Sequence, residues 1–168
     1  PSIENANVIF EMNADGGQIK ASIEQGALSA HRIFEEPRIA LDKMQASIKW
    51  LHQKGQLTVP DWQLSFSNSD AAGSWQGSWK PSTILNSMGV LDLQGSIARA
   101  SANKVYRYLP LSIPQNVRNY VRDAVLGGTV QNVAVKIKGD LKSLPFANPK
   151  DGEFRFAGKV NDVQYAYV

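Results

Sequence analysis

The chain has 168 residues, enough for one domain with a sizeable core, and it contains no cysteine. Disulfide frameworks, thiolate catalysis and cysteine zinc sites are therefore excluded. The net charge is only +3 and the basic residues do not cluster, so nothing in the sequence indicates nucleic-acid binding. No run of apolar residues is long enough to predict a membrane-spanning helix. The chain opens on Pro1 without an initiator Met, so we expect a piece of a longer protein.

Apolar and polar residues alternate along most of the chain, which is typical of strands with one buried face. The alternating runs occupy residues 18–24, 39–42, 44–50, 57–59, 62–66, 75–79, 91–97, 133–137, 154–160 and 163–167. Between Leu41 and Met44 the alternation slips by one residue, which predicts a β-bulge near residues 42–43. Short turns such as Asp15-Gly16-Gly17 separate the runs, and these favour an antiparallel meander over parallel strands.

Helical signals are confined to a short insertion around residues 102–126. Ser101 can cap a first helix, which Pro110 would end. The segment from Ser112 to Gln115 has the spacing of a capping box and predicts a second helix to about residue 126. The pair Gly127-Gly128 then supplies a left-handed stop.

These patterns predict a single, mainly β domain over residues 1–168. Strands are expected in residues 1–100 and 128–168, with the helical insertion at 101–127. Two short helices can cover only part of a sheet of about eight to ten strands. From the pattern alone, the favoured way to cover the rest is a closed barrel or a sandwich, and the alternative is a curved open sheet.

The most specific motifs lie in residues 104–146. They are Tyr108-Leu109-Pro110, Ala124-Val125-Leu126-Gly127-Gly128 and Lys138-Gly139-Asp140-Leu141, the last followed by Leu144-Pro145-Phe146. This string resembles the YhdP-like branch of the AsmA-like envelope proteins, which are related to TamB. The resemblance implies a curved antiparallel meander that forms an open β-groove, and it implies no catalytic step and no cofactor.

The same resemblance implies a role and a place. YhdP-like proteins are associated with phospholipid traffic between the inner and outer membranes of Gram-negative bacteria. The expected ligand is therefore a phospholipid or another acyl chain, and the expected partners are neighbouring segments of the same long chain. The expected location is the periplasm, with the parent protein anchored in the inner membrane.

A groove of this kind would be lined by the alternating apolar residues. The predicted lipid-facing residues are Ile19, Ile23, Leu64, Phe66, Trp75, Trp79, Leu91, Leu93, Val133, Val135, Ile137, Phe154 and Phe156. We expect them all on one concave side, because a slip of one residue would turn a whole strand over. On the second helix, Arg118 and Arg122 are spaced to share one face, which is a weaker candidate for contact with anionic headgroups.

Catalytic and metal-binding patterns are weak in this sequence. His31 and His52 are the only histidines, and neither has further ligands at short spacing, so no metal site is predicted. The adjacent Glu35 and Glu36 would point to opposite faces of a strand, and they mark a solvated turn before Pro37 better than an acid dyad. No nucleophile elbow or phosphate loop is present.

Two other function classes stay open. The exposed edges of a sheet can pair with another chain, which would make this an interaction or assembly module of the envelope. Alternatively, a carbohydrate-binding sandwich would use the tryptophans that gather in residues 50–79. In that cluster Gly77 lies between Trp75 and Trp79 on one strand face, and we expect it to leave room for the two rings or for a ligand.

Overall fold

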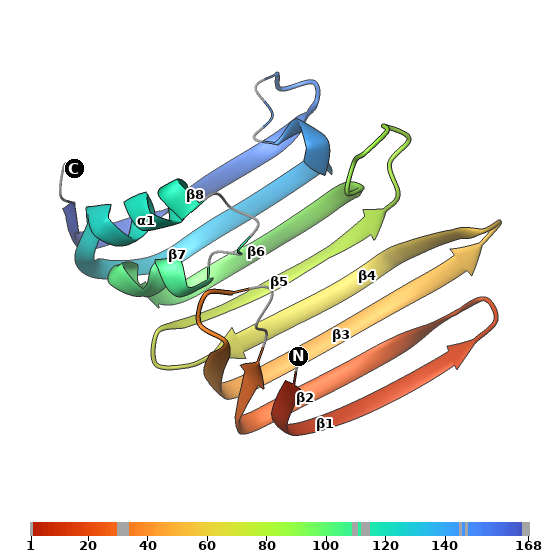
Figure 1. Cartoon of the computed structure of the whole chain (residues 1–168), viewed down its shortest axis with the longest axis horizontal. Coiled ribbons are helices and arrows are strands. Elements are labelled where there is room, and N and C mark those ends of the chain that lie inside the picture. Colours follow the sequence, from red (N-terminus) through yellow and green to blue (C-terminus); the bar gives the residue numbers. More distant parts are fainter. Residues whose placement is uncertain are drawn as a thin grey trace.

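The computed structural model describes residues 2–29, 34–108, 111, 115–144, 146 and 148–165. These residues form one sheet of eight antiparallel strands in the order β1-β2-β3-β4-β5-β6-β7-β8 (Figure 1). The strands are β1 (Ser2–Asn13), β2 (Gly16–Ser29), β3 (Arg38–Gln53), β4 (Gln56–Ser67), β5 (Ala71–Lys80), β6 (Val90–Ser101), β7 (Val125–Asp140) and β8 (Gly152–Tyr165). The predicted mainly β meander is confirmed.

The sheet is open. Each strand pairs with its neighbours in the chain, and β1 and β8 lie at its two edges. The closed barrel or sandwich favoured by the pattern alone is therefore wrong, and the open sheet implied by the family resemblance is right. β1 lay outside the alternating runs found in the sequence, because Ile9 interrupts the alternation of Val8, Phe10 and Met12.

The helical insertion lies between β6 and β7, as predicted, but its boundaries differ. Its first part is a 3-10 helix, η1 (Ala102–Tyr108), and its second is α1 (Gln115–Ala124). The predicted start at residues 112–114 lies outside the described residues. The predicted end was wrong: Val125 already pairs with Tyr165 in the sheet, and Gly127-Gly128 belongs to β7. Pairing with β8 prevails over the local helical pattern.

The predicted bulge near Asp42 and Lys43 was also wrong. β3 pairs with β2 across this point without a register shift. The irregularity instead lies in β2, where Gln25 has a left-handed φ of 50°. Leu41 and Met44 are both buried despite the slip in their alternation.

Glycines let one large ring lie flat on the sheet. The indole of Trp75 lies so close to Gly73 and Gly95 that a Cβ on Gly95 would come within 2.2 Å of the Trp75 ring. Gly77, which the sequence analysis expected to make this room, instead approaches the backbone of Asp92. Phe66 stacks on Trp75 with ring centroids 5.4 Å apart.

Substituting Gly95 tests this arrangement. In Gly95→Val the new side chain meets the Trp75 ring and the backbone oxygen of Ser74, so Trp75 must leave its place. We expect a loss of about 1–3 kcal/mol in the free energy of unfolding, measured in urea. Gly127→Ala is the matched control, since nothing lies within 4 Å of its added Cβ. Equal stability of the two variants would contradict the packing of Trp75 described above.

Candidate functional site

One face of the sheet carries apolar residues from edge to edge, and we call it the apolar face. Its middle row joins directly paired residues of all eight strands: Val8, Ala21, Ala46, Leu64, Trp75, Gly95, Val135 and Phe156. The next row joins Phe10, Ile19, Ile48, Trp62, Gly77, Leu93, Ile137 and Phe154. Directly opposite residues of antiparallel strands point to the same face, so each row lies on one side.

The remaining predicted lining residues join the same face. Ile23, Phe66 and Val133 belong to a third row, and Trp79 pairs with Leu91 in a fourth. The register therefore brings the whole predicted set to one side of the sheet. Contact of these residues with lipid stays a prediction.

Burial varies strongly along this face. Val133 and Val135 are buried, whereas Phe154 and Phe156 next to them keep 50% and 59% of their surface exposed. Large apolar side chains normally bury most of their surface, so contiguous exposure of this kind is unusual.

The helical insertion covers one end of the apolar face. Tyr108, the last residue of η1, stacks on Phe66 with ring centroids 5.9 Å apart. Tyr108 and Phe66 both pack against a buried cluster of Ile23, Ile39, Leu41 and Met44. The insertion thus extends the aromatic stack begun by Trp75 and closes this end of the face.

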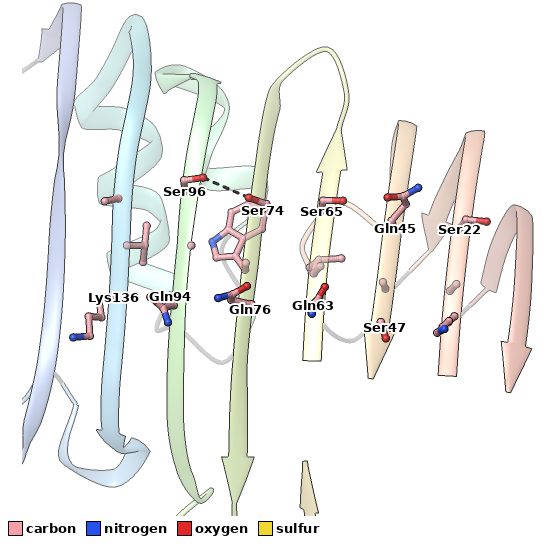
Figure 2. Close-up of a pocket in the computed structure, with 18 of the residues that line it drawn as sticks. Ser22, Gln45, Ser47, Gln63, Ser65, Ser74, Gln76, Gln94, Ser96 and Lys136 are labelled. Atoms are coloured by element: carbon pink, nitrogen blue, oxygen red, sulfur yellow. Dashed lines mark hydrogen bonds between the residues drawn. The ribbon is translucent and has the colours of Figure 1, made fainter. Parts of the chain in front are cut away.

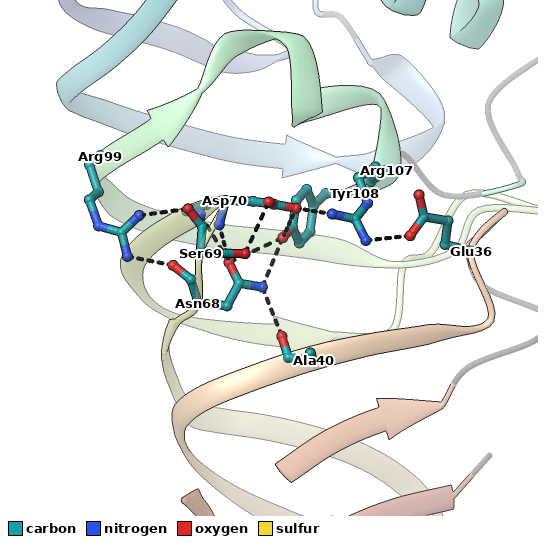
Figure 3. Close-up of polar contacts among 9 residues, drawn as sticks. Glu36, Ala40, Asn68, Ser69, Asp70, Arg99, Arg107 and Tyr108 are labelled. Atoms are coloured by element: carbon teal, nitrogen blue, oxygen red, sulfur yellow. Dashed lines mark hydrogen bonds and ion pairs between the residues drawn. The ribbon is translucent and has the colours of Figure 1, made fainter. Parts of the chain in front are cut away.

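Polar contacts fix η1 to the turn between β4 and β5 (Figure 3). Arg107 forms ion pairs with Asp70 and with Glu36. The amide of Asn68 donates to the Tyr108 hydroxyl at 2.9 Å and to the Ala40 carbonyl at 3.0 Å. We call Asn68, Asp70, Arg107, Tyr108 and Glu36 the clamp. Asn68 and Asp70 are buried, so their bonds are shielded from water, whereas the Glu36 side chain is 38% exposed.

The electrostatics of the clamp follow from its contacts. The hydrogen bond to Glu36 raises the pKa of Arg107, which keeps its charge fixed. Burial raises the pKa of Tyr108, because the ionised phenolate would be poorly solvated there. The hydroxyl of Tyr108 therefore stays protonated and donates to the Asp70 carboxylate at 3.3 Å.

The acidic pair of the sequence analysis belongs to the same attachment. Glu35 and Glu36 lie in an exposed turn, as expected, and they also form ion pairs: Glu36 with Arg107, and Glu35 with Arg118 of α1 at 2.9 Å. Only 11% of the Arg118 side chain is exposed, and Arg122 bonds its neighbour Asp123 at 2.8 Å. The structure thus gives both candidate headgroup residues carboxylate partners within the protein. Sequence reasoning missed the clamp because its members are far apart in the chain.

The opposite, polar face contains a shallow hollow of about 880 Å³ (Figure 2). Serine and glutamine dominate its centre, as in the directly paired Gln63, Gln76 and Gln94. The sequence analysis expected the concave side to be the apolar one. This hollow instead lies on the face opposite to the one that was expected to be concave. Uncharged polar side chains suit this face to water.

No metal or membrane-spanning feature emerges from the residues that the structure describes. Within them, no group of three or more His, Asp and Glu side chains is placed to hold a metal ion. His52 is exposed at the end of β3, and His31 lies outside the described residues. Among the described helices, none combines the length and apolarity needed to cross a membrane.

Comparison with known proteins identifies a family. The family model described as YhdP protein matches residues 1–168. Searches of curated proteins and of solved structures returned no match.

The clamp should contribute measurably to stability. Arg107→Met removes both of its ion pairs and leaves the buried Asp70 carboxylate without its cation. We expect a loss of about 1–3 kcal/mol in the free energy of unfolding by urea. The control is Arg38→Met, which removes an exposed pair with Glu4 and should leave stability unchanged. If Arg107→Met left the free energy of unfolding unchanged, the clamp would not be what holds the insertion.

Tyr108 should make the fold sensitive to alkaline pH. Its pKa is raised above the unfolded value of 10.0, so the folded state holds the proton more tightly. The stabilisation is complete below the unfolded pKa and is lost as pH rises through the folded pKa. Urea unfolding is measured at a series of pH values for the parent chain and for Tyr108→Phe. As pH rises through the folded pKa of Tyr108, we expect the parent chain to lose more stability than the variant. If the stability of both chains changed with pH in the same way, the raised pKa of Tyr108 would not be the cause.

Proposed function

This chain belongs to the YhdP protein family, and we propose that its apolar face shields the acyl chains of phospholipid. Membership fits an envelope protein of the AsmA-like type. On this proposal the chain is a non-enzymatic segment of a periplasmic carrier, and the lipid passes along it between the inner and outer membranes. The parent protein would be anchored in the inner membrane, with neighbouring segments of the same chain extending the apolar surface.

The observation that supports this proposal best is the continuity of the two complete apolar rows. They cross all eight strands without a charged residue, and their exposed end at Phe154 and Phe156 lies on a β-strand at the edge of the sheet. An acyl chain laid on such a surface gains about 0.8 kcal/mol for each CH₂ that leaves water. A headgroup can stay in water at the same time, because the sheet is open.

The tryptophans favour this function over carbohydrate binding. Trp62 and Trp75 belong to the two apolar rows, and Trp75 is stacked on Phe66. A sugar platform needs polar, hydrogen-bonding side chains beside its rings. Here the rings contribute to a continuous apolar surface.

A second candidate function follows from the two edges of the sheet. β1 is exposed over its whole length and β8 forms the other edge. Such edges have free N–H and C=O groups that pair with another strand. Pairing with neighbouring segments is compatible with lipid shielding, since it would lengthen the same apolar face.

Native mass spectrometry of the purified chain tests the proposal. We expect bound phospholipid, and we expect Leu93→Arg to reduce it about tenfold, because a charge in the middle of a row interrupts apolar contact. Leu93 is only half-buried, so its arginine can reach water and the melting temperature should change little.

Gln94→Arg is the matched control. It places the same charge one position along the same strand but on the polar face. This variant should keep the lipid. Absence of phospholipid from the parent chain, or equal loss in both variants, would refute the shielding role of the apolar face.

A further inference from the structure

The loop of residues 81–89, which joins β5 and β6, presents large apolar side chains to solvent. Ile84, Leu85 and Met88 are exposed over 47%, 80% and 72% of their surfaces. The loop lies at the end of the sheet away from α1 (Figure 1). Exposed apolar residues this close together are uncommon on a soluble protein without a partner.

Hydrogen bonds to residues outside the loop hold it in place. The carboxylate of Asp140 accepts hydrogen bonds from the hydroxyls of Ser82 and Ser87. The indole N–H of Trp79 donates to the Met88 carbonyl at 2.9 Å, and the ammonium of Lys142 donates to the Leu85 carbonyl at 2.7 Å. These bonds keep the backbone from folding its apolar side chains back onto the sheet.

Rigid presentation lowers the cost of binding. A mobile loop would lose conformational entropy when its apolar side chains entered a partner, whereas this loop is already ordered. The hydroxyls of Ser82 and Ser87 also lower the pKa of Asp140, so its carboxylate stays ionised and keeps accepting these bonds. The arrangement is typical of a preformed contact surface.

The size and charge of this surface favour a lipid bilayer over a protein as its partner. Three side chains offer a few hundred Å², which is well below the roughly 800 Å² that each partner of a stable protein pair buries. Lys80 and Lys142 lie beside them and are exposed. The ionised Asp140 offsets one of these charges, and Lys150 and Asp151 in the neighbouring turn offset each other, so one positive charge is left over. A small apolar tip flanked by lysines fits the interface of an anionic bilayer.

We propose that residues 81–89 dock on a phospholipid surface, with Ile84, Leu85 and Met88 entering the interface and Lys80 and Lys142 facing the headgroups. This inference goes beyond the shielding of acyl chains by the apolar face and does not depend on it. On this view the loop brings one end of the sheet to a membrane surface without spanning it.

Vesicle flotation tests the docking. With vesicles of phosphatidylethanolamine and phosphatidylglycerol, the parent chain should bind, and a variant with Ile84, Leu85 and Met88 changed to Asn should bind about tenfold or more weakly. Lys80→Gln should weaken binding to these vesicles but not to uncharged phosphatidylcholine vesicles. Ile9→Asn, an equally exposed apolar site on the polar face of β1, is the control and should bind like the parent.

Several results would overturn this proposal. They are absence of binding by the parent chain, equal binding by the loop variant, and self-association without lipid that the loop variant abolishes. The last would make a second copy the partner. If the triple variant unfolds, vesicle binding of Leu85→Asn is measured in its place, because Leu85 has little packing to lose.

The test also separates this proposal from acyl shielding. The loop variant should keep its bound phospholipid in native mass spectrometry while losing vesicle binding. Leu93→Arg should do the reverse. Loss of both properties in the loop variant would mean that docking and shielding share one surface, contrary to the separate roles inferred here.

Discussion

An unbroken register through the centre of the sheet is the constraint on which the rest of this structure depends. Side chains alternate between faces along a strand, so a single shift within the central rows would place apolar residues on the polar side. The register shifts occur outside these rows, as between Lys49 and Leu51 or between Ala72 and Gly73. Even the shift between Gln131 and Ala134, near the middle of β7, lies outside them, so the two central rows stay continuous.

Continuity creates a covering problem that the chain solves only in part. Within the part of the chain that the structure describes, no second layer covers this open sheet, and the helical insertion covers one end of its apolar face. Covering that end required polar bonds as well as packing. Tyr108 packs against the apolar cluster and hydrogen-bonds Asn68, and Arg107 adds an ion pair to Asp70; Asn68 and Asp70 are both buried. Such a network specifies one position for the insertion, which a purely apolar contact would fix less sharply.

Much of the fold follows from the sequence, and the reasons for the exceptions are physical. Alternation at Leu91 and Leu93 or at Val133 and Val135 predicts strands and faces correctly, because a period of two is a local property. The end of α1 does not follow, since Val125 is held in the sheet by a strand forty residues away. Alternation also cannot predict whether the sheet closes into a barrel, because closed barrels and open sheets have the same alternation.

The candidate site also has parts that the sequence predicts and parts that it does not. Membership of the apolar face was predictable residue by residue, because it depends on strand periodicity alone. The clamp was not, because Glu36, Asp70 and Arg107 come together only when the turns and the insertion meet in space. The loop at residues 81–89 does leave a signal in the sequence, because Ile84, Leu85 and Met88 stand among serines and a proline, outside every alternating run. Apolar residues that serve neither a strand face nor a helix face need an explanation, and rigid presentation to a lipid surface supplies one.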